Sequence, residues 1–126
     1  MIECDDLKTF TVLYVEDEDT VREIIGRSLK RSCKEVFLAA NGQEGLDIFK
    51  AHHCDLVVTD IEMPVMNGVE MIKRIKELDE DRPCVVVTAY KDESHRSELA
   101  EVTVFKPVDL NELREAMKQA CKKRYG

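Results

Sequence analysis

Short apolar runs alternate along the chain with segments in which apolar residues recur every three or four positions. The runs of strand length are TVLYV (11–15), EVFLAA (35–40), DLVVT (55–59), CVVVTA (84–89) and VTVF (102–105). They are rich in valine and lack the strict alternation of half-exposed strands, which is typical of strands covered on both faces. The pattern therefore predicts five strands in a parallel sheet.

The segments between these runs have the period of amphipathic helices. The positions expected on buried helix faces are Val21, Ile24, Ile25 and Leu29; Leu46 and Phe49; Met71, Ile72, Ile75 and Leu78; and Leu110, Leu113, Met117 and Cys121. The segment KDESHRSELAE (91–101) offers little beyond Leu99 and Ala100 to bury, so its helix is expected to be short or irregular. About five helices result.

Strict alternation of strands and helices predicts a doubly wound α/β fold with right-handed crossovers. For the strand order 2-1-3-4-5, the winding reverses between the first and third strands, and ligands bind beyond the carboxyl ends of the strands at that point. The first strand ends in Glu16-Asp17 and the third in Asp60. The expected ligand site is therefore lined with carboxylates.

The composition narrows the class of partner. A chain of 126 residues with 44% hydrophobic and 36% charged residues is expected to fold as one domain. Its net charge of −7 argues against a surface that binds nucleic acid or an anionic membrane. Proteins and cations are the expected partners.

Cysteine usage and hydropathy indicate a cytoplasmic protein. The five cysteines are an odd number without a C-x-x-C pair, which favours reduced, cytoplasmic thiols. The longest apolar stretches run five or six residues, and the first ten, MIECDDLKTF, are acidic. We therefore expect neither a signal peptide nor a membrane anchor.

The carboxylates at the strand ends predict a metal site. Two carboxylates about 4 Å apart repel by about 4 kcal/mol at an effective dielectric constant near 20, which a cation relieves. Oxygen ligands without accompanying histidine or cysteine favour a hard ion, and two or three carboxylates with water favour Mg²⁺. Glu18 and Asp19, by contrast, are expected to start the first helix, where negative charge complements the helix dipole.

A hard cation at a strand end commonly neutralises a phosphoryl group, and the chain places suitable partners at other strand ends. Asp60 can act as a carboxylate nucleophile, Thr88 closes the fourth strand with a hydroxyl, and Lys106 follows the fifth strand with an ammonium group. The residues thus predict phosphoryl chemistry at Asp60.

Four stretches, VLYVEDE, DIEMPVMNG, VVVTAY and FKPVD, occur in this order and in register with the predicted strands. Together they closely resemble the receiver domain of bacterial two-component response regulators of the chemotaxis-regulator type. The resemblance implies a flavodoxin-like fold, with an N-terminal extension at 1–10 and the receiver domain at 11–124.

The resemblance also implies a role for each site residue. Asp60 would take phosphate from a histidine kinase, with transfer and dephosphorylation catalysed by the site itself. Mg²⁺ would be bound by the side chains of Asp17 and Asp60, by the backbone carbonyl of Glu62 and, through water, by Glu16. Thr88 and Lys106 would each contact a phosphoryl oxygen. The Lys106-Pro107 peptide bond is expected to be cis.

The expected partners follow from the same resemblance. They are a sensor histidine kinase as phosphodonor, and a downstream protein or a covalently linked output domain. A phosphorylation-dependent homodimer is a further expectation. Whether the chain is a stand-alone regulator or a segment of a longer protein stays open.

Two features depart from the family pattern. The aromatic residue that usually stands three positions before the lysine is replaced by Thr103, for which Phe105 or Tyr90 are the candidate substitutes. Only 17 residues separate Thr88 from Lys106, about one helical turn fewer than in the family. These features predict a non-standard output surface formed by the fourth helix, the fifth strand and the fifth helix.

Alternative functions differ in the chemistry they require. A magnesium-dependent phosphohydrolase of the haloacid dehalogenase type would need a second Asp two residues after Asp60, where Glu62 stands. A flavodoxin-like electron carrier would need a hydroxyl-rich loop in place of EDEDT. A degenerate receiver that binds partners without phosphorylation is the remaining alternative. His52, His53 and Cys54 are interpreted as a surface turn with a buried thiol.

Overall fold

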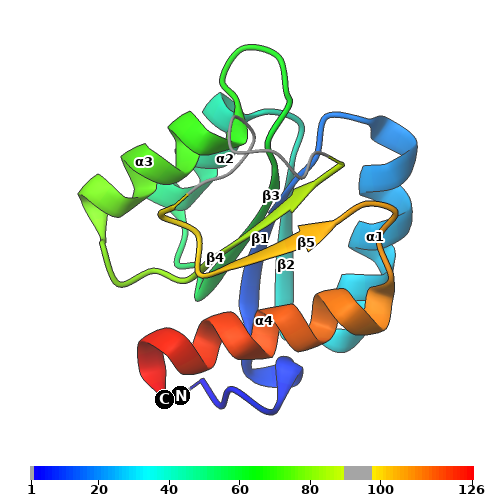
Figure 1. The fold of residues 1–126 in the computed structure, drawn as a ribbon, viewed down its shortest axis with the longest axis vertical. Coiled ribbons are helices and arrows are strands. Elements are labelled where there is room, and N and C mark those ends of the chain that lie inside the picture. Colours follow the sequence, from blue (N-terminus) through cyan, green and yellow to red (C-terminus); the bar gives the residue numbers. More distant parts are fainter. Residues whose placement is uncertain (1, 90–97) are drawn as a thin grey trace.

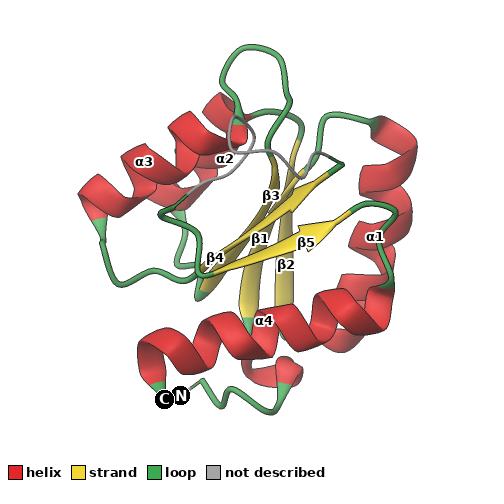
Figure 2. Ribbon diagram, in the orientation of Figure 1, coloured by secondary structure: helices red, strands yellow, loops and turns green. Residues whose placement is uncertain are grey.

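A parallel five-stranded sheet forms the centre of the molecule (Figures 1 and 2). The computed structural model describes residues 2–89 and 98–126. The strands are β1 (Thr11–Val15), β2 (Glu35–Ala39), β3 (Leu56–Asp60), β4 (Cys84–Thr88) and β5 (Val102–Phe105). Their order is β2-β1-β3-β4-β5, and every neighbouring pair is parallel. The predicted fold class and strand order are confirmed.

Helices cover both faces of the sheet (Figure 2). Within the described residues these are α1 (Asp19–Ser32), α2 (Gly42–Ala51), α3 (Gly68–Leu78) and α4 (Leu110–Tyr125), preceded by the 3-10 helix η1 (Leu7–Thr9). Most of the helix expected in 91–101 lies outside the described residues, which omit 90–97. Residues 98–101 contain no helix. No helix of the described part is long and apolar enough to cross a bilayer.

The sheet separates two hydrophobic clusters. Alternate residues of β1 face opposite sides, so that Val12 and Tyr14 pack with α1 and α4, while Leu13 and Val15 pack with α2 and α3. Residues in β1, β3 and β4 are buried along their whole length, which explains the continuous apolar runs. Full burial of one such side chain contributes about 1.5–3 kcal/mol.

Asparagine and aspartate caps set the starts of three helices. Asn41 accepts a hydrogen bond from Glu44 N–H before α2, and Asn67 accepts one from Glu70 N–H before α3. Asp109 caps α4. Each cap contributes about 1 kcal/mol and fixes the loop that precedes its helix.

Two residues expected on buried helix faces are exposed. Ile24 in α1 is 60% exposed and Leu78 at the end of α3 is 56% exposed. Adjacent positions on a helix are about 100° apart, so when Ile25 points into the core Ile24 points toward its rim. Leu78 is the last residue of α3, where the helix leaves the sheet.

The prediction of five reduced thiols was wrong for one pair of cysteines. Cys4 and Cys121 form a disulfide that joins the segment before β1 to the end of α4. Leu7 and Phe10 of this segment bury their side chains in the same hydrophobic cluster as α1 and α4, and Lys122 forms a 2.6 Å ion pair with Asp5. Of the described cysteines, Cys33, Cys54 and Cys84 are free and buried.

Candidate phosphoacceptor site

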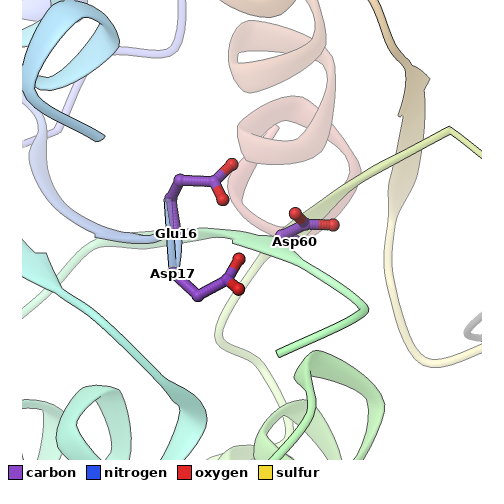
Figure 3. Close-up of side chains that lie close together, drawn as sticks. All are labelled: Glu16, Asp17 and Asp60. Atoms are coloured by element: carbon purple, nitrogen blue, oxygen red, sulfur yellow. The ribbon is translucent and has the colours of Figure 1, made fainter. Parts of the chain in front are cut away.

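Three carboxylates gather where β1 and β3 end. Glu16 and Asp17 directly follow β1, and Asp60 is the last residue of β3. One carboxylate oxygen from each lies within 4.8 Å of the others, and the side chains lie side by side from two strands (Figure 3). Glu16 and Asp60 are buried, whereas Asp17 is exposed. The carboxylate cluster predicted from the strand ends is therefore present.

Strand register brings these residues to the same level. Val15, the last residue of β1, pairs with Thr59, the residue before Asp60. The Glu16 N–H extends the ladder by donating to Ala39 O at 3.0 Å. Because β1 is bonded to both β2 and β3, the backbone that carries the acidic pair is fixed at the centre of the sheet.

The loop after β3 holds the Asp60 carboxylate. Oδ1 of Asp60 accepts the Ile61 N–H at 2.7 Å, and the Gly68 N–H donates to Ile61 O at 2.8 Å. A Cβ atom on Gly68 would lie 2.0 Å from Asp60 O, so only glycine fits at the start of α3. Asn67-Gly68 therefore shapes the loop that presents Asp60.

Lys106 reaches the cluster from the end of β5. Its Nζ donates to Asp60 Oδ2 at 2.7 Å and lies 3.5 Å from Glu16 Oε1. Partial burial alone would lower the pKa of Lys106, but the hydrogen bond and charge of Asp60, with the charge of Glu16, raise it above its ordinary value. The lysine is therefore a protonated counter-ion of the carboxylates.

Thr88 lies beside Lys106 on the neighbouring strand. It is 1% exposed at the end of β4, and its carbonyl accepts the Lys106 N–H at 2.8 Å. Asp60 pairs with Val87, the residue before Thr88. The backbone thus brings Asp60, Thr88 and Lys106 to one edge of the sheet, as the sequence predicts.

The electrostatics of the cluster favour a bound cation. Burial raises the pKa of Glu16, and the nearby Asp60 charge raises it further, against the opposing effects of the Glu18 N–H and Lys106. A buried carboxylate with a raised pKa next to two others gains from a divalent ion. Hard oxygen donors with no sulfur or nitrogen ligand suit Mg²⁺, so the residues present fit this metal.

Other residues named from the sequence lie at the margins of the site or away from it. The Lys106-Pro107 bond is cis, as predicted. Glu62 is exposed in the loop after β3. Phe105 is 37% exposed, and Tyr90 lies outside the described residues. His52 and His53 are exposed while Cys54 is buried, so the interpretation as a surface turn with a buried thiol is confirmed.

The sequence interpretation missed Arg22 in α1. Its Nη1 donates to Glu16 O at 2.8 Å and to Asp17 O at 3.4 Å, and its Nη2 donates to Asp19 at 2.5 Å. A single arginine five residues after an acidic pair gives little sequence signal, because charged residues fill most of this segment.

Comparison with known families agrees with this geometry. The sequence model of the response regulator receiver domain family matches residues 12–118, which is most of the chain. The chain therefore belongs to the response regulator receiver domain family and is a receiver domain of two-component signal transduction.

Curated relatives place this domain in proteins of different lengths. The chain is 35% identical over 112 residues to sporulation initiation phosphotransferase F of Bacillus subtilis, covering 86% of this chain and 90% of that protein. It is 34% identical over 110 residues to the autoinducer 1 sensor kinase/phosphatase LuxN of Vibrio campbellii, covering 85% of this chain but only 13% of that protein.

Solved structures share the fold. The response regulator protein TrrA of Thermotoga maritima, in complex with Mg²⁺ and BeF, has a TM-score of 0.79 and 33% identity, with 89% of this chain and 99% of that chain covered. The receiver domain of the hybrid histidine kinase CckA has a TM-score of 0.74 and 31% identity, with 88% and 98% covered.

Proposed function

We propose that Asp60 is the phosphoacceptor of this receiver domain and that a sensor histidine kinase is its phosphodonor. The observation that carries the proposal is the position of the Asp60 carboxylate, which lies within 4.8 Å of two other carboxylates and 2.7 Å from Lys106 Nζ. A nucleophilic carboxylate flanked by a metal site and a fixed cation is what transfer of a phosphoryl group to an acid requires.

In the transfer step, a carboxylate oxygen of Asp60 attacks phosphorus and the phosphorus–nitrogen bond of phosphohistidine breaks, with the electron pair returning to the histidine nitrogen. Ile61 N–H donates to Oδ1 of Asp60 at 2.7 Å and Lys106 Nζ donates to Oδ2 at 2.7 Å, so attack through Oδ2 requires Lys106 to release this oxygen and turn to the incoming phosphoryl group. Lys106 and the Thr88 hydroxyl would then hold two oxygens of the transferred group.

Asp17 and Asp60 would bind Mg²⁺ through their side chains, Glu62 through its backbone carbonyl and Glu16 through water. When bound, the metal neutralises the charge that accumulates on the phosphoryl oxygens. Asp17 is exposed and open to solvent, whereas Glu16 is buried and hydrogen-bonded to Glu18 N–H at 3.1 Å. This difference supports direct ligation by Asp17 and an indirect role for Glu16.

The expected catalysis is limited to self-catalysed transfer and slow autodephosphorylation. A magnesium-dependent phosphohydrolase is the competing activity, and it would turn over a substrate such as p-nitrophenyl phosphate repeatedly. A degenerate receiver would accept no phosphate at all. The presence of Asp60, Thr88 and Lys106 at one edge of the sheet argues against a degenerate receiver. Glu62, at the position where the phosphohydrolase needs a second Asp, argues against that activity.

We propose receiver-domain boundaries of 11–124, with 1–10 as an N-terminal extension. The match of the family model to 12–118 supports this division. The output would be a downstream protein or a linked domain, since this chain spans 90% of one relative but only 13% of LuxN. Phosphorylation would promote a homodimer, and the output surface around Thr103 and Phe105 would be non-standard.

We propose a cytoplasmic location, without direct binding to nucleic acid or membrane. The net charge of −7 supports the proposal that the chain binds neither nucleic acid nor an anionic membrane directly. The cytosol generally keeps thiols reduced. The free, buried thiols of Cys33, Cys54 and Cys84 fit this location, whereas the Cys4–Cys121 disulfide is the kind of bond found in oxidising compartments.

Binding of beryllofluoride, a phosphoryl mimic, tests the proposed function. We expect Mg²⁺-dependent fluoride signals in ¹⁹F NMR for the wild type and their absence in Asp60→Asn. Thr88→Ala should bind more weakly. Equal binding by wild type and Asp60→Asn, or none by either, would exclude Asp60 as the acceptor.

A further inference from the structure

Arg22 holds the turn that carries the metal-binding acids by its backbone. The guanidinium Nη1 donates to Glu16 O at 2.8 Å and reaches Asp17 O at 3.4 Å. These contacts span six and five residues, so they are not the side-chain pairs of an ordinary helix surface. They link α1 to the two residues whose side chains face Asp60.

The arginine itself is fixed in place. Its Nη2 donates to the Asp19 carboxylate at 2.5 Å, and its side chain is only 20% exposed. A guanidinium is planar and presents several donors in a rigid fork, so the two carbonyls and the carboxylate together define its orientation. A lysine carries its three donors on a single atom at the end of a flexible chain, so it would not reproduce the fixed spacing of the two guanidinium nitrogens.

The turn has little other side-chain support. Among the described residues, Glu18 at the N-cap of α1 makes no side-chain capping bond, unlike the N-caps of α2, α3 and α4. Glu18 N–H instead donates to the Glu16 carboxylate at 3.1 Å. Without the arginine, the backbone of Glu16 and Asp17 would depend on two hydrogen bonds. One runs from Glu18 N–H to the Glu16 carboxylate, and the other runs from Glu16 N–H to Ala39 O in β2.

We propose that Arg22 is a positioning residue that preorganises Glu16 and Asp17 for Mg²⁺ by donating hydrogen bonds to their backbone carbonyls. The inference rests on the proposed function, because it assumes that Mg²⁺ binds at this cluster. The positioning role predicts the direction in which Mg²⁺ affinity changes when Arg22 is removed. A cation that acted only through its charge would repel Mg²⁺, so its removal would strengthen binding, whereas loss of a positioning residue weakens it.

The test is a calorimetric titration of Mg²⁺ into wild type, Arg22→Ala and Arg22→Lys. Loss of a residue that orients metal ligands costs about tenfold in metal affinity or more, so we expect about tenfold weaker binding by Arg22→Ala. Arg22→Lys should fall between the two. The phosphorylation rate of Arg22→Ala should recover at saturating Mg²⁺. In the metal-free protein, the amide shifts of Glu16 and Asp17 should change.

Arg27→Ala is the matched control, because Arg27 lies on the same helix and pairs only with the exposed Glu23 among the contacts described. It should bind Mg²⁺ as the wild type does. Unchanged or tighter binding by Arg22→Ala would overturn the positioning role. If Arg22→Ala does not fold, Arg22→Lys carries the test, and wild-type affinity in that variant would overturn it. Absence of Mg²⁺ binding by the wild type would instead overturn the proposed function.

Discussion

Lys106 Nζ lies 2.7 Å from Asp60 Oδ2 and 3.5 Å from Glu16 Oε1, so one ammonium group is shared by two carboxylates of the cluster. The lysine thus supplies part of the positive charge that the cluster needs. A divalent ion at the same cluster must share these carboxylates with it.

Lys106→Met should therefore strengthen Mg²⁺ binding while slowing phosphorylation. Removal of the competing charge is expected to tighten binding about fivefold, which corresponds to about 1 kcal/mol. Phosphorylation slows because a phosphoryl oxygen loses its partner. Calorimetry measures the first effect and acetyl phosphate kinetics the second. Lys34→Met, at an exposed position, should change neither; weaker Mg²⁺ binding by Lys106→Met would contradict the shared-charge account.

Gly68→Ala should disturb the site through the backbone. The new Cβ would lie 2.0 Å from Asp60 O, which is backbone and cannot rotate away. We expect a loss of about 2 kcal/mol in the free energy of unfolding, measured by urea denaturation, and slower phosphorylation. Gly26→Ala is the control, because the three atoms nearest its Cβ would all belong to the flexible Leu38 side chain. Equal effects of the two substitutions would refute this role for Gly68.

Glu101 should make stability depend on acid pH. Its side chain is 5% exposed and accepts from Lys76 Nζ at 3.0 Å, from Arg124 Nε at 2.6 Å and from Cys84 N–H at 2.8 Å. Burial alone would raise the pKa of Glu101, but these bonds outweigh it and hold the pKa below its ordinary value of 4.5. The charged form is therefore favoured in the folded state.

Proton linkage gives the direction in which the stability of the fold changes with pH. The unfolded chain binds the proton more readily, so the contribution of Glu101 to stability is complete above pH 4.5 and is lost as the pH falls through the lower, folded pKa. Glu101→Gln should cost about 3 kcal/mol at neutral pH, because it leaves Lys76 buried without its counter-ion. The difference from wild type in urea unfolding should shrink toward acid pH, and a constant difference would contradict this.

Reduction of the Cys4–Cys121 disulfide should lower stability without affecting the site. The bond spans 117 positions in the sequence, and closing a loop of this size stabilises by about 3 kcal/mol or more. Dithiothreitol should lower the melting temperature of the wild type and leave that of Cys4→Ser/Cys121→Ser unchanged. Equal melting temperatures of the wild type with and without reductant would show that the bond contributes nothing.

The fold and the acidic cluster could be predicted because both depend on local patterns. Buried parallel strands read as valine-rich runs, and the carboxyl ends of such strands meet at one edge, so Asp17 and Asp60 could be placed together without coordinates. Lys106 and Thr88 followed from the same rule.

The remaining features depend on tertiary contacts that no local pattern encodes. Cys4 and Cys121 lie at opposite ends of the chain, and an odd cysteine count favours the reduced state, so the disulfide was not predicted. Arg22 acts on backbone carbonyls, which every residue has. Ile24 fits the helical period of α1. Its exposure depends on how closely α1 packs against the sheet, which the period does not determine.

The central claim, that Asp60 takes up a phosphoryl group with the help of a divalent ion, is tested most directly by intact mass. Wild type incubated with acetyl phosphate and Mg²⁺ should gain the mass of one phosphoryl group, and chelation of the metal or the Asp60→Asn substitution should abolish the gain. An unchanged wild-type mass, or the same gain in Asp60→Asn, would contradict the account.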